Sequence, residues 1–332
     1  MSKPARISYV IVAVLLVLVG FLHLATLLLT TLFGYFSLRL FSFNRSKALG
    51  VAIYLIAVAG IGYGLFYFSR KAYVELPDIA TRTIPAVVEY AEKQGLDLPF
   101  TDYADLKTLA LNSVKEKFAN VGRYARAAVL QVAMLIIGLV VAVGLFLDAR
   151  WQMEGDPHAV KGSLYALVSQ ELALRCRTFY RSFATVIGAQ ITISAINTLL
   201  TTAFLVWAGY GYVMVLVGIA FLCGLLPIIG NILSNTLIVG VGFTISPKVA
   251  FWALLFLVLV HKLEYFLNSK IIGDRIKNPM WLTLLGLVLG EKLMGIPGMI
   301  LAPVVLHYIK VEASRNKVSD LASDGAESRK AA

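Results

Sequence analysis

The sequence contains a stretch of 66 residues, Ser182–Pro247, without one charged side chain. As a single α-helix at 1.5 Å per residue this stretch would be about 99 Å long, whereas a bilayer core of about 30 Å takes roughly 20 apolar residues per crossing. Three further charge-free runs lie at Ile7–Leu38, Ala48–Ser69 and Ala127–Leu147. Apolar residues make up 59% of the chain, and its mean hydropathy is +0.79. These features predict an all-α, polytopic helical membrane protein with about eight membrane segments, some of them broken or re-entrant hairpins.

The basic residues indicate how the chain is oriented in its membrane. They lie mostly in short segments between the apolar runs rather than in one block, so the net charge of +11 does not indicate a nucleic-acid partner. A cytoplasmic N-terminus places 19 of the 30 Lys and Arg residues in cytoplasmic segments. The positive-inside rule therefore predicts that both termini are cytoplasmic. The segments counted in this way are 1–7, 39–47, 149–181, 262–277 and 310–332.

The distribution of charge also divides the chain into regions. The run Ile7–Leu38 would form a helix of about 48 Å, so we expect it to cross twice, with a single tilted helix as the alternative. Residues 70–126 hold nine basic and eight acidic residues and three prolines, and an amphipathic helix is expected after Asp102. The predicted regions are N-terminal transmembrane helices (1–69), an extracytoplasmic helical insert (70–126), a transmembrane helix (127–148), a cytoplasmic helical linker (149–181), a transport core with two broken or hairpin elements (182–310) and a cytoplasmic tail (311–332).

The linker ends on three arginines. Asp156 and Pro157 have the residue types of a helix start, and an apolar stripe follows them. Arg175, Arg177 and Arg181 then lead into the long charge-free region. We expect these three side chains to meet lipid phosphate.

A polar stripe opens the charge-free region. Gln190, Ser194, Asn197 and Thr201 stand at offsets of 0, 4, 7 and 11. At 100° per residue they fall within about 40° of one another on a helix. Polar groups in hydrocarbon need partners, so the stripe should face other helices or water. Two roles are open for it: hydrogen bonds between helices, or the lining of a solute path.

A helix break is predicted further along the same region. Pro227 and Gly230 are followed by Asn231 and Asn235. Backbone groups freed by proline and glycine at membrane depth are tolerated where they are buried in protein or line a cavity. Broken helices of this kind hold substrates and coupling ions in several transporter folds. The alternative is a simple proline kink.

His261, Glu264 and Asn268 follow at offsets of 0, 3 and 7 and share one helix face. Glu264 lies close to the end of an apolar helix and could bind a proton or a cation such as sodium. The alternative is that all three are ordinary solvated groups at the cytoplasmic interface.

A second broken element is expected between Pro279 and Pro303. Only eleven apolar or small residues precede Glu291 and Lys292, and Gly295 and Gly298 follow. A helix of twelve residues reaches about 18 Å, too short for a full crossing. We therefore predict a hairpin with Glu291 and Lys292 at its tip, and with hinges at Pro279, Gly295, Gly298 and Pro303.

The sequence carries none of the common motifs of hydrolases, metalloproteases, P-loop enzymes or dinucleotide-binding enzymes. Cys176 and Cys223 have no metal-type spacing. We therefore expect no enzymatic activity, no metal site and no cofactor beyond a sodium ion or proton as coupling ion.

Three motifs carry a family resemblance: LLPIIGN at Leu225–Asn231, EYFLNSKIIGDRIKNP from Glu264, and MGIPGMILAPVV from Met294. In these the chain resembles the autoinducer-2 exporter family of bacterial membrane transporters, best over residues 160 to 310. The family's Pro-x-x-Gly break falls on Pro227 and Gly230, and its Glu-x-x-x-Asn pair on Glu264 and Asn268. The chain departs from the family pattern before Pro279, where it has Asn278 instead of a histidine.

The resemblance implies a location in the bacterial inner (plasma) membrane and homo-oligomeric assembly, with a pentamer as the expected form. It also implies export of small polar signals or, for some members, exchange of sodium or lithium against protons. Together with the residues above, it predicts a secondary transporter or facilitator of a small polar solute. Three rival readings are a passive channel, a non-transporting membrane scaffold and an intramembrane enzyme; the last lacks a nucleophile or metal-ligand set near His261 and Glu264.

Overall fold

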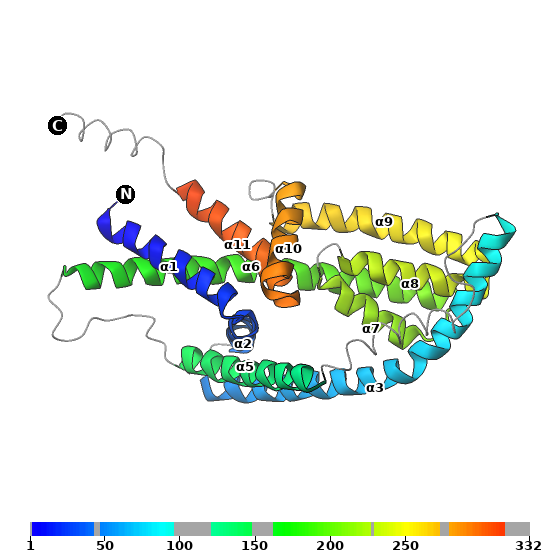
Figure 1. The fold of residues 1–332 in the computed structure, drawn as a ribbon, viewed down its shortest axis with the longest axis horizontal. Helices are drawn as coiled ribbons and strands as arrows, with labels where there is room; N and C mark the ends of the chain where they lie inside the picture. The colour runs from blue at the N-terminus through cyan, green and yellow to red at the C-terminus, as the bar shows by residue number, and fades with distance from the viewer. Residues whose placement is uncertain are drawn as a thin grey trace. The chain divides into compact units, whose positions relative to one another are not determined.

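The computed structural model describes residues 2–42, 47–95, 121–147, 162–226, 229–272 and 279–315. Every regular element in these ranges is an α-helix (Figure 1). The predicted all-helical class is therefore confirmed. The helices are α1 (Lys3–Phe21), α2 (Ala25–Phe41), α3 (Lys47–Lys93), α5 (Val121–Leu147), α6 (Leu164–Trp207), α7 (Val213–Gly224), α8 (Ile229–Ile245), α9 (Pro247–Ile272), α10 (Met280–Met294) and α11 (Ile296–Arg315).

Five stretches of the described chain are long and apolar enough to cross a membrane. Many large apolar side chains on these helices are exposed, for instance Val17 at 70% and Ile56 at 73%, as expected for surfaces that face lipid. The protein is thus a polytopic helical membrane protein, and the number of about eight segments stays a prediction. The five are α1, α3, Val129–Leu147 within α5, α6 and α11.

The first apolar run is divided into two helices. α1 ends at Phe21 and α2 begins at Ala25, with a turn between them. His23 in this turn has a φ of 53°, in the left-handed region that ends a helix. The run Ile7–Leu38 is therefore not one continuous helix, and that it crosses twice stays a prediction.

Two prolines of the insert, Pro77 and Pro85, lie inside α3 and do not end it. The helix continues from Lys47 to Lys93 through Pro77 and Pro85, and its second half is bent (Figure 1). A proline removes one backbone hydrogen bond and kinks a helix. Between the two prolines, Ile79, which is 2% exposed, packs into a buried apolar cluster. The amphipathic helix predicted after Asp102 lies outside the described residues.

α6 is a continuous helix of 44 residues that includes the predicted boundary between residues 181 and 182. It ends at Trp207, and Gly209, with a φ of 72°, lies in the turn that follows. Tyr212, the residue before α7, donates a hydrogen bond from its hydroxyl to the Asp78 carboxylate of α3. The helix start predicted at Asp156 and Pro157 lies outside the described residues.

The chain divides into two compact units, each considered by itself below. The first unit comprises Met1–Leu55, Leu130–Gly188 and Ile272–Ala332, and the second comprises Ile56–Val129 and Ala189–Ile271. The second unit has a buried apolar core to which α3, α6, α7, α8 and α9 all contribute. Phe204 of α6 stacks on Phe256 of α9 in this core, with 4.4 Å between the ring centroids.

The predicted break near Pro227 is present as a helical hairpin. α7 has only 12 residues and ends at Gly224, and α8 begins at Ile229 and packs against it. Pro227 itself lies outside the described residues. At Gly230 a Cβ atom would stand 1.7 Å from the backbone oxygen of Cys223, so the two arms touch through a position that only glycine can occupy. Twelve residues reach about 18 Å, less than a bilayer core.

Gly230→Ala should therefore destabilise this hairpin and lower the yield of folded protein. The added methyl group must push a backbone carbonyl aside, and overpacking of this kind typically costs about 1–3 kcal/mol or more. Thermal unfolding in detergent would measure the effect. Gly144→Ala on α5 is the matched control, because nothing lies within 4 Å of a Cβ atom there. Equal melting temperatures for the two variants would contradict the close contact.

The second predicted hairpin is formed by α10 and α11. Gly295, with a φ of 65°, makes the turn between them. The arms touch at Gly290 and Gly298, where a Cβ atom on Gly298 would stand 2.0 Å from the Gly290 oxygen. The expected tip was wrong by about one turn: Glu291 and Lys292 lie in the last turn of α10, because the glycine that can adopt a positive φ follows them. Pro303 lies inside α11.

Candidate functional site

The carboxylate of Glu264 joins three helices of the second unit. Its Oε2 atom accepts a hydrogen bond from Asn231 Nδ2 of α8 at 2.8 Å and one from Asn197 Nδ2 of α6 at 3.2 Å. Glu264 itself is on α9, and its side chain is 16% exposed. Hydrogen bonds to a charged acceptor are roughly twice as strong as neutral ones. The broken hairpin (α8), the polar stripe (α6) and the helix that carries Glu264 (α9) therefore meet at one oxygen atom, Glu264 Oε2.

A small cavity borders this carboxylate, and we call it the Glu264 cavity. Its volume is about 30 Å³, which is room for a water molecule or a single small cation. Six of the predicted site residues line it, and they come from α6, α8 and α9. These are Asn197, Thr201, Asn231, Asn235, His261 and Glu264.

Oxygen atoms make the Glu264 cavity suitable for a cation. Asn197 Oδ1 is buried and has no hydrogen-bond partner among the described atoms, although its amide nitrogen is engaged with Glu264. Hard cations are bound by carboxylate, amide and hydroxyl oxygens. His261 Nδ1 lies 4.0 Å from Glu264 Oε2, and the imidazole is 67% exposed. A cation or a proton could thus replace the amide donors on the carboxylate.

The first half of the polar stripe has a different position from the second half. Gln190 Nε2 donates to the Gly224 oxygen at 2.6 Å, and Ser194 Oγ donates to the Phe221 oxygen at 3.0 Å. The two carbonyls between Phe221 and Gly224 accept hydrogen bonds from the backbone N–H groups of Leu225 and Leu226. All four carbonyls of the last turn of α7 are satisfied in this way, as the end of a helix in a membrane requires. Gln190 and Ser194 thus hold the break, whereas Asn197 and Thr201 line the cavity.

The remaining predicted site residues are not brought to the Glu264 cavity in the described part of the chain. Gly230 lies at the contact between α7 and α8, and Pro227 and the Asn268 side chain lie outside the described residues. The hinge residues belong to the first unit and do not line this cavity. They are Pro279, Gly295, Gly298 and Pro303.

Two polar lining residues were missing from the prediction. Thr198 lines the cavity beside Asn197, and Ser234 lines it one turn after Asn231. Ser234 is 6% exposed and donates its hydroxyl hydrogen to the Gly230 oxygen at 3.0 Å. The sequence could have indicated Ser234, because it follows Asn231 by three residues and residues three apart share a helix face.

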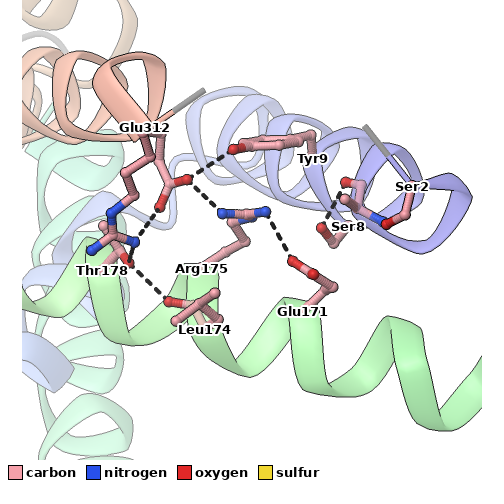
Figure 2. A network of polar contacts seen from close by, with 10 residues as sticks. Ser2, Ser8, Tyr9, Glu171, Leu174, Arg175, Thr178 and Glu312 are labelled. Carbon is pink, nitrogen blue, oxygen red and sulfur yellow. Dashed lines mark hydrogen bonds and ion pairs between the residues drawn. The ribbon is translucent and has the colours of Figure 1, made fainter. Parts of the chain in front are cut away.

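A second polar cluster lies in the first unit, and Figure 2 shows it from close by. Glu312 Oε2 of α11 accepts hydrogen bonds from Arg175 Nη1 of α6 at 2.6 Å and from the Tyr9 hydroxyl of α1 at 2.8 Å. Arg175 also pairs with Glu171 at 2.9 Å, and its guanidinium lies over the Tyr9 ring at 4.1 Å. Arg175 and Glu312 are 7% and 4% exposed. We call these four residues the Arg175–Glu312 cluster.

This cluster corrects one prediction. Arg175 was expected to meet lipid phosphate together with Arg177 and Arg181, but it is buried in an ion pair within the protein. The reason is that its position on α6 faces α1 and α11, which place a carboxylate and an aromatic ring beside it. Arg177 and Arg181 are exposed.

Two comparisons with known proteins bear on this geometry. The family model described as AI-2E family transporter matches residues 2–314. A protein of Bacillus subtilis (strain 168), named "Putative transport protein YdbI", is 22% identical over 228 residues, which is 68% of this chain. The aligned part spans 59% of the length of that relative. The family match includes residues of both units, the residues that line the Glu264 cavity and the Arg175–Glu312 cluster.

Proposed function

The chain belongs to the AI-2E family of transporters, and from this premise we propose that it is a secondary transporter that exports a small polar solute. The Glu264 carboxylate is the proposed site of the coupling proton or cation. Family membership supports transport rather than enzymatic activity. The solute class, the direction, the location in a bacterial inner membrane with both termini cytoplasmic, and the homo-oligomeric assembly are parts of the proposal.

One observation carries the coupling site: a little-exposed carboxylate on α9 is held by amides from two other helices, one of which belongs to a broken hairpin. An acidic group at such a position is costly and marks an ion or substrate pathway in membrane proteins. When a proton or cation binds the carboxylate, the two Asn amides lose their charged acceptor. Binding would thus weaken the connection between α6, α8 and α9, and this links occupancy to the movement of helices.

The size of the Glu264 cavity favours an ion over a solute at this point. A volume of about 30 Å³ does not hold a molecule of several heavy atoms. A sodium or lithium/proton antiporter is for this reason the second candidate function. In that case the ions themselves would be the transported species, and no organic solute would be needed.

A deletion strain and the same strain carrying the wild-type gene would test the exporter proposal. The complemented strain should release at least one small polar metabolite that the deletion strain retains, as measured by mass spectrometry of the medium. Release should stop when the proton and sodium gradients are collapsed with ionophores. Release that continues without gradients would indicate a passive channel. Identical media from both strains would contradict export.

Purified protein in liposomes separates the second candidate from the first. An entrapped pH-sensitive dye should report proton movement when sodium or lithium chloride is added outside, if the protein is an antiporter. Potassium chloride and protein-free liposomes are the controls. Proton movement driven by sodium without any organic solute would support the antiporter and contradict the strict solute exporter.

A further inference from the structure

An open cleft of about 570 Å³ lies in the first unit between α2 and α6. Its walls carry two arginines, Arg39 of α2 and Arg181 of α6. None of the described residues that line it is acidic. The cleft therefore has two positive charges that no lining carboxylate neutralises, which is the electrostatic pattern of an anion site.

The two arginines lie at the ends of apolar segments. Arg39 is in the last turn of α2, and Arg181 directly precedes the charge-free run Ser182–Pro247. Charged residues that flank apolar helices lie where the chain leaves the hydrocarbon and meets the headgroups. Phospholipid phosphates occupy this level of a bilayer. Both guanidinium groups are exposed and can reach a phosphate there.

The rest of the cleft suits the other parts of a lipid molecule. Phe36, Leu40 and Ala184 give it apolar surface for acyl chains, and Leu40 is 62% exposed. Tyr180 is fixed edge-to-face against Tyr35, with 4.9 Å between ring centroids, and the Arg39 guanidinium lies 6.0 Å from the centre of the Tyr180 ring. A tyrosine at the headgroup level and an arginine held near its ring are thus part of the site.

We propose that this cleft binds an anionic phospholipid, with its phosphate between Arg39 and Arg181 and its acyl chains along Phe36 and Leu40. Guanidinium groups bind phosphate with paired, charge-assisted hydrogen bonds. Basic pockets between transmembrane helices are suited to anionic headgroups. A zwitterionic lipid would bring its ammonium group to a cleft that already holds two positive charges, so anionic lipids are preferred.

Native mass spectrometry of the full-length protein in detergent would test the lipid site, with phosphatidylglycerol as the probe. Wild type should retain phosphatidylglycerol and bind phosphatidylcholine much more weakly. The double variant Arg39→Gln/Arg181→Gln should bind phosphatidylglycerol about 30-fold more weakly, since each arginine near a phosphate contributes about a factor of five. Arg177→Gln is the matched control, because Arg177 is exposed on the same helix but does not line the cleft.

Three outcomes would overturn the proposal. Equal binding of phosphatidylglycerol by wild type and the double variant would show that the two arginines do not bind the lipid. Equal binding of phosphatidylcholine and phosphatidylglycerol by wild type would show that the cleft does not prefer anionic lipids. Displacement of the lipid by millimolar inorganic phosphate would indicate a soluble phosphate ligand instead. If the double variant does not fold, Arg39→Lys/Arg181→Lys keeps the charge and should retain phosphatidylglycerol over phosphatidylcholine.

Discussion

Glu264→Gln is expected to reduce gradient-driven transport by at least about tenfold, because contacts of a charged group are worth about 1.5–3 kcal/mol and 1.4 kcal/mol is a factor of ten. The substitution preserves the size of the side chain and leaves an oxygen that can accept a hydrogen bond from Asn231 or Asn197. It removes the charge that a proton or cation would bind. The fold should therefore persist while coupling is lost.

The measurement is uptake or efflux by reconstituted liposomes under an imposed proton or sodium gradient. Glu291→Gln is the matched control, because Glu291 is an exposed carboxylate on α10 that does not line the Glu264 cavity. Asn231→Ala should give an intermediate loss, since it removes one donor and keeps the charge. Wild-type transport by both Glu264→Gln and Asn231→Ala would show that the coupling site lies elsewhere, even if the protein is a transporter.

Glu312→Ala is expected to destabilise the first unit by about 3–5 kcal/mol, the usual cost of removing one partner from a buried ion pair. The variant leaves the Arg175 guanidinium, 7% exposed, with Glu171 as its remaining carboxylate. It also removes the hydrogen bond from the Tyr9 hydroxyl of α1 to the Glu312 carboxylate of α11 (Figure 2). The loss should appear as a lower melting temperature in detergent.

Two further variants separate the ion pair from simple packing. Arg175→Met/Glu312→Leu should recover much of the lost stability, because replacing both buried charges with apolar side chains is often neutral or stabilising. Glu171→Gln should cost less than Glu312→Ala, since Glu171 is 31% exposed and a glutamine oxygen can still accept a hydrogen bond from Arg175. If the double variant were no more stable than Glu312→Ala, the cluster would act through shape rather than through charge.

Several features of the site could be predicted from the sequence because they belong to a single helix. The spacing of Gln190, Ser194, Asn197 and Thr201 defines one face of α6 wherever that helix packs. Pro227 with Gly230 similarly predicted a break, and the structure has the end of α7 and the start of α8 on either side. Such signals are local, because helical periodicity and backbone breaks depend only on neighbouring residues.

Other features depend on which helix faces meet. The sequence could not divide the polar stripe into a half that bonds the end of α7 and a half that borders Glu264, since both roles need the same residue types. It also missed the Arg175–Glu312 pair, whose members are 137 positions apart. Nor did the sequence specify that α3 continues through Pro77 and Pro85, with Ile79 packed into a cluster that also contains residues of other helices.

The sequence by itself determined that this protein is a helical membrane protein with a break near Pro227, a second broken element between Pro279 and Pro303, and an acidic residue on an apolar helix. Hydrophobic runs, breakers and isolated charges are constrained by the bilayer, which acts on each segment separately. Only the tertiary structure decided that the amides of Asn197 and Asn231 meet the carboxylate of Glu264. The physical reason is that contacts between segments depend on how side chains pack across helix interfaces, and periodicity along one segment does not specify the partner face.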